Sequence, residues 1–343
     1  MTRDQSGDVI VVGGGVIGLT TAIVLARSGR RVRVWAREPA ERATSAVAGA
    51  LWWPYRIRPE SLVGDWALES LAVYRELAER SEETGVRLVE GVHGETRLDG
   101  LGAWAAGIDG LRAATDAEYP GTGLWGQLPL IDMSTHLPWL REQLLRAGGR
   151  AEERAVTDLA EPAAEAPVVV NCTGLGAREL AGDPLVHPVR GQLVVVENPG
   201  ITTWLTSVDH SAKASTYILP QPGGLILGGT AEEDDWSLTP DPRTAAEIVA
   251  RCSAVRPEIA GARVLQHRVG LRPARDTVRL EREVLPGGGT VVHNYGHGGA
   301  GVTVAWGCAR RGGGGGGPRP PADRRAGPPR GGGGGTATAP PPP

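Results

Sequence analysis

The chain has 343 residues, more than the roughly 250 to 300 at which a single hydrophobic core stops growing, so we expect two lobes around one cleft. Its 36 basic and 39 acidic side chains give a net charge of -3, which offers no electrostatic reason to expect nucleic acid or an anionic membrane surface as partner. A small molecule is therefore the expected partner.

The cysteines and the first residues bear on location. Cys172, Cys252 and Cys308 are an odd number without metal-ligand spacing, so we expect neither a disulfide framework nor a metal site. The apolar stretch near the start is broken by glycines and followed by arginines, unlike a signal peptide or a membrane span. We therefore expect a cytoplasmic protein without membrane contact.

The first part of the chain has the pattern of a β-α-β unit. Residues 9–12 are a short apolar run, residues 16–26 carry apolar side chains at helical spacing, and Val32 and Val34 mark a second strand. A long amphipathic helix is expected over residues 61–84. These elements predict an α/β lobe.

Later segments predict a second lobe. A helix capped by Ser134 should run to Leu145, and residues 167–171 should form a buried parallel strand that returns to the first lobe. Gly223 and Gly224 should join two strands as a hairpin. The strand-like runs that predict an antiparallel sheet are 192–197, 215–220 and 225–230.

A glycine-rich turn lies between the first strand and helix. Gly13, Gly15 and Gly18 form G-x-G-x-x-G, whose bare backbone amides can meet a pyrophosphate at the positive end of the helix. The acid that would bind the ribose hydroxyls is missing at the end of the second strand, where Arg37 and Glu38 follow instead. Since such an arginine can accommodate the extra phosphate of NADP, a nicotinamide-dependent dehydrogenase remains an alternative.

Five further segments resemble one known family. They are residues 44–55, with the run Ala48-Gly49-Ala50-Leu51-Trp52, and residues 170–174, 190–192, 270–275 and 293–308. Together with the glycine turn, they are similar in content and order to the D-amino-acid oxidase family. The resemblance runs from Val9 to Cys308 and implies FAD as cofactor, with a D-amino acid and oxygen as substrates.

The implied architecture is α/β, with a Rossmann-like FAD-binding domain and a second, mainly antiparallel-sheet substrate domain. We place the FAD-binding domain at residues 1–52, 134–186 and 268–310, and the substrate domain at 53–133 and 187–267. A homodimer is a candidate assembly. Residues 311–343 hold 12 glycines and 9 prolines without apolar periodicity, which predicts a disordered tail.

Three residues are the expected substrate anchors. The guanidinium of Arg272 matches a planar carboxylate with two charge-assisted hydrogen bonds. By resemblance, the hydroxyl of Tyr217 joins this carboxylate and the carbonyl of Gly299 accepts from the substrate amine. The resemblance also implies direct hydride transfer from the α-carbon to the flavin, so that no side chain acts as base and the products are a 2-oxo acid, ammonia and hydrogen peroxide.

The expected cofactor contacts come from the same segments, and a helix beginning near Gly301 should direct its positive dipole at the flavin ring. These contacts are Gly13, Gly15, Val16, Ile17, Gly18, Arg37, Glu38, Thr44, Ser45, Gly49, Ala50, Leu51, Trp52, Thr173, Gly174, Arg272, Gly298, Gly299, Gly301, Val302 and Thr303.

Two departures leave questions open. Many vertebrate members carry a second tyrosine where this chain has Lys213, which either attracts an acidic substrate side chain or faces solvent, while Trp53 could wall the side-chain pocket and favour apolar D-amino acids. The helical pattern at 302–310 stops where the family's last helix continues. A non-catalytic flavoprotein damaged by that loss is therefore a further alternative.

Overall fold

The computed structural model of the chain describes residues 8–54, 57–208 and 214–313. Lys213 and residues 314–343 of the expected tail lie outside this range. Residues 311–313 belong to the last helix, α8 (Gly301–Gly313), so the helix continues past the expected start of the tail at Arg311. Within the described range, no helix has the length and apolarity needed to cross a membrane.

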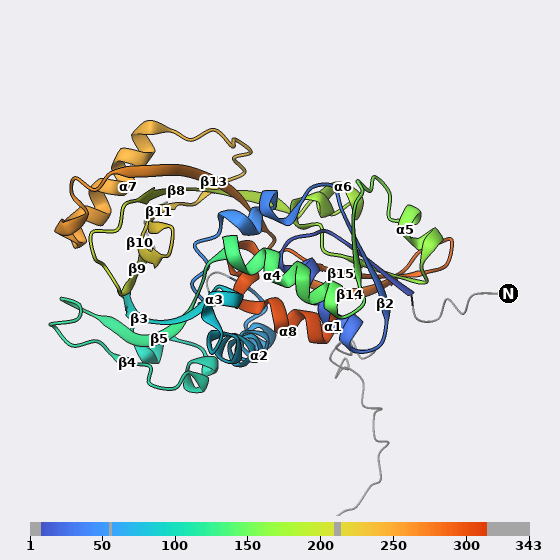
Figure 1. Ribbon diagram of the computed structural model, residues 1–343, viewed down its shortest axis with the longest axis horizontal. Helices are drawn as coiled ribbons and strands as arrows, with labels where there is room; N and C mark the ends of the chain where they lie inside the picture. Colours follow the sequence, from blue (N-terminus) through green and yellow to red (C-terminus); the bar gives the residue numbers. More distant parts are fainter. Residues whose placement is uncertain (1–7, 55–56, 209–213, 314–343) are drawn as a thin grey trace, which may run out of the picture.

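One sheet has six strands and is parallel except at one edge (Figure 1). Its buried centre is formed by short runs of valine and isoleucine, typical of strands covered on both faces. The helices α1 (Val16–Arg27) and α4 (Met133–Arg146) pack together beside it, with α8 against α1. In spatial order the strands are β14 (Arg279–Val284), β15 (Thr290–Tyr295), β7 (Val168–Asn171), β1 (Asp8–Val12), β2 (Arg31–Ala36) and β6 (Arg150–Glu153).

The other sheet has nine strands and is mainly antiparallel, with β3 and β9 parallel. Helix α7 (Pro242–Val255) covers one face through Ile248 and Cys252, and the opposite face turns toward the first sheet's helices (Figure 1). The spatial order is β12 (Glu232–Glu233), β8 (His187–Val196), β11 (Gly224–Thr230), β10 (Ala214–Gln221), β9 (Trp204–Val208), β3 (Val86–Gly94), β5 (Gly123–Ile131) and β4 (Arg112–Ala113), with β13 (Val264–Ala274) paired to β8.

The α/β class, the parallel strand at 167–171 and the hairpin between β10 and β11 are confirmed. Three boundaries differ from the predictions. The long helix divides into α2 (Glu60–Ala78) and α3 (Ser81–Thr84), and α4 is capped by Asp132, whose carboxylate accepts from Ser134 N at 3.1 Å. Ser134 is thus not the cap. Residues 268–274, expected in the FAD-binding domain, pair with β8 in the nine-stranded sheet.

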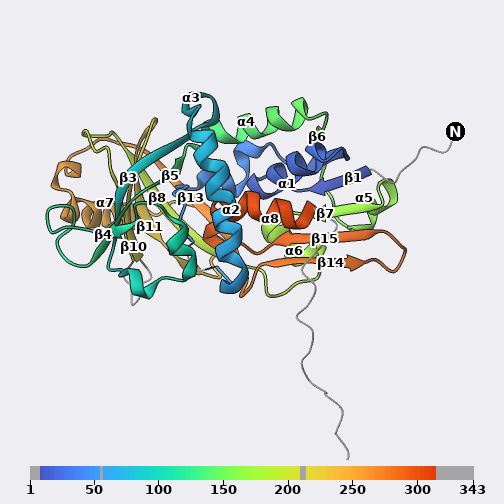
Figure 2. The same ribbon diagram turned by 90° about the horizontal axis from the view of Figure 1, so that it is seen from below.

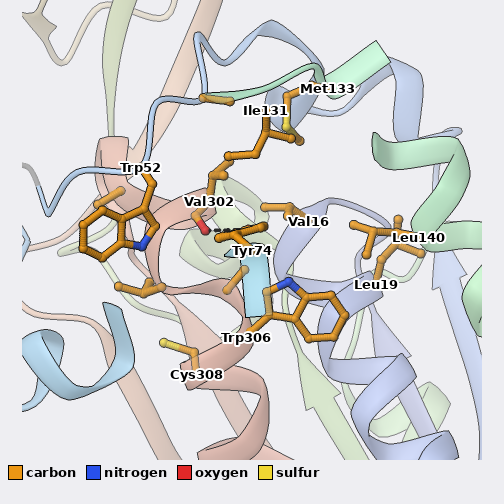
Figure 3. Packing of buried hydrophobic residues seen from close by; sticks show 14 of the residues in the cluster. Val16, Leu19, Trp52, Tyr74, Ile131, Met133, Leu140, Val302, Trp306 and Cys308 are labelled. Carbon is orange, nitrogen blue, oxygen red and sulfur yellow. Dashed lines mark hydrogen bonds between the residues drawn. The ribbon is translucent and has the colours of Figure 1, made fainter. Parts of the chain in front are cut away.

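Helix α8 is buried from Val302 to Ala309, between α1 and α2 (Figure 2). One of its first carbonyls also accepts a hydrogen bond from outside the helix: the Tyr74 hydroxyl donates to Val302 O at 2.8 Å (Figure 3). Further along, Gly307 N donates to Ser70 Oγ at 3.0 Å. A helix that is apolar on every face must be enclosed in this way.

The crossing of α2 and α8 yields the first prediction. A Cβ at Gly307 would lie 2.3 Å from Trp66 O and 2.4 Å from Trp66 Cα, which are backbone atoms that cannot rotate away. Gly307→Ala should therefore lower the free energy of unfolding by about 1 to 3 kcal/mol, the usual cost of overpacking. Urea unfolding measures this.

Gly312→Ala is the matched control on the same helix. Its Cβ would meet the end of the Leu280 side chain at 3.3 Å, which can yield. Removing a helical glycine should there be neutral or stabilising by up to about 1 kcal/mol. Equal stability of Gly307→Ala and the parent would contradict the close crossing.

Candidate active site

A cavity of about 840 Å³ lies between the two sheets and is lined by residues from both. It reaches from the glycine turn after β1 to Tyr217 on β10 and Arg272 on β13. This volume is in the upper part of the range of ligand pockets. The segments that the sequence singled out therefore meet around one space.

The glycine turn is built by close backbone approaches. Gly13 has φ +114°, and a Cβ there would lie 2.3 Å from Cys172 O, while one on Gly18 would lie 1.9 Å from Gly13 O. Gly18 does not line the cavity; its place is the contact between helix and strand. Helix α1 starts without an acidic residue in its first turn, and Val16 N donates to Ser45 Oγ at 3.0 Å. The positive end of α1 thus faces the cavity.

Arg37 and Glu38 both line the cavity beyond β2. Their side chains form an exposed ion pair at 3.8 Å. Exposed pairs of this kind are weak, so both side chains can turn to a ligand. The geometry alone therefore does not discriminate between a ribose and its phosphate.

The segment after η1 (Ala40–Arg42) supplies several of the expected flavin contacts. Those that line the cavity are Thr44, Ser45, Gly49, Ala50 and Leu51. Trp52 does not: its indole is fully buried in the core and donates to Ala67 O at 3.2 Å. Alternation along an extended segment explains this, because Leu51 and Trp53 face the cavity while Trp52 faces α2.

Tyr217 and Arg272 converge because glycines leave room for them. Ideal Cβ atoms on Gly228 and Gly229 would lie 2.2 Å and 2.5 Å from the Tyr217 hydroxyl, and one on Gly191 would lie 2.4 Å from both terminal nitrogens of Arg272. Arg272 Nη1 donates to Thr230 O at 3.0 Å. The phenol and the guanidinium therefore lie over adjacent parts of one sheet surface.

A polar network behind Arg272 is absent from the sequence-based site. Thr230, whose carbonyl holds Arg272, accepts from Gln192 N at 3.0 Å through its hydroxyl. The buried Arg190 donates to Gln192 Oε1 at 3.1 Å and to Glu232 Oε2 at 2.5 Å. The sequence pointed to this network only through the Arg190-Gly191-Gln192 triplet, which gave a resemblance to the family but no functional role for these side chains.

The turn before α8 brings Gly298, Gly299, Gly301, Val302 and Thr303 to the cavity wall. It passes through η7 (Gly298–Ala300), with Gly298 at φ +53°. Thr303 Oγ1 donates to Trp53 O at 3.0 Å and lies 3.3 Å from Trp53 N, which ties the flavin segment to α8.

His297 is a buried imidazole at the same wall. It is 3% exposed, and its Nε2 has no hydrogen-bond partner among the described residues. Burial lowers the pKa of His297 to about 3, so the ring is neutral at neutral pH. A neutral ring that lacks a partner fits a site completed by a polar ligand.

Three further residues, His93, Thr206 and Trp53, make a corner of the cavity that the sequence did not predict as a unit. His93 and Thr206 share a hydrogen bond of 2.6 Å between Nδ1 and Oγ1. The His93 ring lies 4.5 Å from the Trp53 ring, which meets Trp104 edge-on at 5.3 Å. His93 belongs to no recognisable sequence motif, because its contacts Trp53 and Thr206 lie far from it in the chain.

The family model for FAD dependent oxidoreductases, DAO, matches residues 8–311. The chain belongs to this family. The expected Gly13, Gly15, Thr173 and Gly174 line the cavity at the ends of parallel strands, where such folds bind their cofactor. Within the described residues, no group of three or more metal-ligating side chains is present.

Characterised relatives in this family are close in sequence. D-amino-acid oxidase of Streptomyces coelicolor is 71% identical over 308 residues, covering 90% of this chain and 96% of that protein. D-amino-acid oxidase of Rubrobacter xylanophilus is 50% identical, covering 88% and 93%. Human D-aspartate oxidase is 36% identical, covering 88% and 92%.

Solved structures agree in fold. Glycine oxidase from Geobacillus kaustophilus has a TM-score of 0.73 at 20% identity, covering 88% of this chain and 92% of that one. FAD fits the residues present: glycines at 13 and 15 keep side chains out of the turn, and His297 leaves a buried nitrogen for a ligand. FAD is the family's cofactor.

Two buried imidazoles should make the protein sensitive to acid. Burial lowers the pKa of His136 to about 4, as it lowers that of His297 to about 3, whereas an unfolded histidine titrates near 6.5. Because the unfolded chain binds protons first, this stability is present above about pH 6.5 and is lost as pH falls. Each histidine should cost about 2 kcal/mol between pH 7 and pH 5.

Urea unfolding at these two pH values tests the assignment. His297→Asn should reduce the loss of stability between pH 7 and pH 5 by about 2 kcal/mol relative to the parent. An equal loss in the parent and in His297→Asn would refute the neutral, buried state of His297.

Proposed function

We propose that this protein oxidises D-amino acids with FAD, giving 2-oxo acids, ammonia and hydrogen peroxide. The observation that carries the proposal is the meeting of Arg272, Tyr217 and Gly299 on one cavity with the flavin segments, in a chain 71% identical to D-amino-acid oxidase of Streptomyces coelicolor. Human D-aspartate oxidase, at 36%, is the more distant relative.

Arg272 and Tyr217 hold the substrate carboxylate in this proposal. One guanidinium nitrogen of Arg272 is engaged by Thr230 O, and the group lines the cavity with its remaining donors. Two parallel hydrogen bonds from such a fork fix the orientation of a carboxylate as well as its position. The Gly299 carbonyl accepts from the substrate amine, which sets the third point.

The cofactor is held by the turn after β1, by residues 44–51 and by the segment leading into α8. When bound, FAD would supply the acceptor for the hydride of the substrate α-carbon, and oxygen would then take up the two electrons. The chain's own residues orient the α-carbon and exclude water, so no side chain is assigned as a base. The positive end of α8 favours negative charge at the adjoining wall.

The two alternatives are not favoured. A nicotinamide-dependent dehydrogenase rested on Arg37, whereas the family match at residues 8–311 makes FAD the cofactor. A damaged flavoprotein rested on the residues that follow Arg310, whereas the chain matches 96% of the length of the Streptomyces coelicolor enzyme at 71% identity, which favours an active enzyme. The remaining proposals are the two-domain division, with β13 reassigned to the substrate domain, cytoplasmic residence and a homodimer.

The purified protein tests the activity directly. It should be yellow and release FAD on heating or with acid, and it should form peroxide with D-alanine but not with L-alanine. Three anchors present the α-hydrogen of only one enantiomer to the cofactor. Bound NADPH in place of FAD, or equal peroxide from both enantiomers, would contradict the proposal.

Arg272→Ala should keep the flavin spectrum and lose most turnover. Each hydrogen bond to a charged group contributes about 1.5 to 3 kcal/mol, so losing a pair should lower kcat/KM by about a hundredfold to ten-thousandfold. Arg272→Lys should recover part of this, because an ammonium cannot form the fork.

Arg268→Ala on the same strand is the matched control, since Arg268 lies outside the cavity and pairs with Gln266 at 2.8 Å. It should change kcat/KM by less than about fivefold. The same small change in a flavin-loaded Arg272→Ala protein would remove Arg272 from the substrate site.

A further inference from the structure

A row of paired residues crosses the nine-stranded sheet beneath the cavity. His93 on β3 is in register with Thr206 on β9, and Thr206 is in register with Tyr217 on β10. Tyr217 is in turn paired with Gly228 on β11. Directly paired residues point to the same face of a sheet, so His93, Thr206 and Tyr217 form one line that faces the cavity.

The row has two chemically different ends. At one end Tyr217 lies beside the Arg272 guanidinium, the proposed carboxylate anchor. At the other end His93 lies two strands away, about 10 Å across the sheet. A substrate held by its carboxylate at the first end has the space toward His93 left for its side chain.

The His93 end is a fixed wall. The imidazole is 7% exposed and shares a hydrogen bond of 2.6 Å with Thr206. Its ring packs at a tilt of 35° against the Trp53 ring, with the ring centroids 4.5 Å apart. Trp53 is itself held by Thr303 through its backbone and by Trp104 through an edge-on contact. Aromatic faces with engaged polar atoms favour apolar groups over ions.

Charged side chains on the cavity wall lie elsewhere. Among the described residues, the charged side chains that line the cavity are Arg272 and a group on the nucleotide side. These nucleotide-side residues are Arg37, Glu38, Arg42, Arg154 and Glu179. A carboxylate placed at the His93 end would thus lose its hydration without meeting a cation among the described residues.

We propose that His93, positioned by Thr206 and packed against Trp53, determines specificity for the substrate side chain. It closes the compartment that receives this side chain and so limits the length of the apolar side chains that are accepted. This inference rests on the proposed function and deepens it by naming a residue that sets its specificity.

The size of the compartment is tested with His93→Ala. Removing the imidazole lengthens the space along the row, so large apolar side chains gain relative to small ones. The ratio of kcat/KM for D-phenylalanine to that for D-alanine should rise about tenfold or more, as pockets discriminate by 10- to 200-fold per methylene. The measurement is peroxide release by flavin-loaded protein.

The position of His93 beside the substrate side chain is tested by a gain of activity. His93→Arg puts a cation at the end of the compartment, and a carboxylate there can take two hydrogen bonds from it. The ratio of kcat/KM for D-glutamate to that for D-leucine should rise at least about tenfold, since one such contact corresponds to 1.4 kcal/mol or more. Loss of packing alone would not produce this gain.

Val92→Ala is the matched control. Val92 is the buried neighbour of His93 on the opposite face of β3, so it shares any destabilisation of the strand but not the cavity. Both substrate ratios should stay within about threefold of the parent. If His93→Ala fails to retain flavin, His93→Asn serves the size test with the same expected direction.

The outcomes separate the two proposals. A parent that oxidises no D-amino acid overturns the proposed function, and the role of His93 with it. Unchanged ratios in both His93→Ala and His93→Arg, in flavin-loaded and active proteins, remove His93 from the compartment.

Discussion

The enclosure of α8 is the constraint on which the rest of the structure depends. Its residues from Val302 to Ala309 are buried, so α1 and α2 must cover it on both sides. The same helix begins at the cavity, and its Thr303 fixes the backbone of Trp53. Packing of the core and placement of the cofactor segment therefore depend on the same helix. A displacement of α8 would move the start of that helix and Trp53 together, and both line the cavity.

Missing side chains position the substrate anchors as much as present ones do. Tyr217 lies over Gly228 and Gly229, and the Arg272 guanidinium lies over Gly191. The Thr230 carbonyl accepts from Arg272, the Thr230 hydroxyl accepts from the backbone N of Gln192, and the Gln192 side chain accepts from the buried Arg190. The glycines leave room for the Tyr217 ring and the Arg272 guanidinium close to the sheet, and this packing restricts both side chains. Side chains that are held in place before binding lower the entropy lost when a substrate is oriented.

Local patterns predicted the elements well and the three-dimensional neighbours poorly. The apolar run at 167–171 and the glycine turn could be recognised because strands and turns depend on residues close in sequence. The helix cap is Asp132 and not Ser134, and Trp52 faces the core and not the cavity. A shift of one or two residues along the chain decides such details, and local patterns do not fix it. His93 could not be found, since its contacts with Trp53 and Thr206 join segments about 40 and 110 residues apart in the chain.

The separation of Tyr217 from His93 along one sheet has a consequence for how such a protein can diversify. In the proposed arrangement, the residue that binds the group common to all substrates and the residue that meets the variable group lie on two strands of one sheet, with β9 between them. Substitutions at β3 can thus accumulate without disturbing β10 or β13. A substitution on β3 can therefore change which substrate side chain is recognised, while the residues on β10 and β13 that bind the carboxylate stay the same.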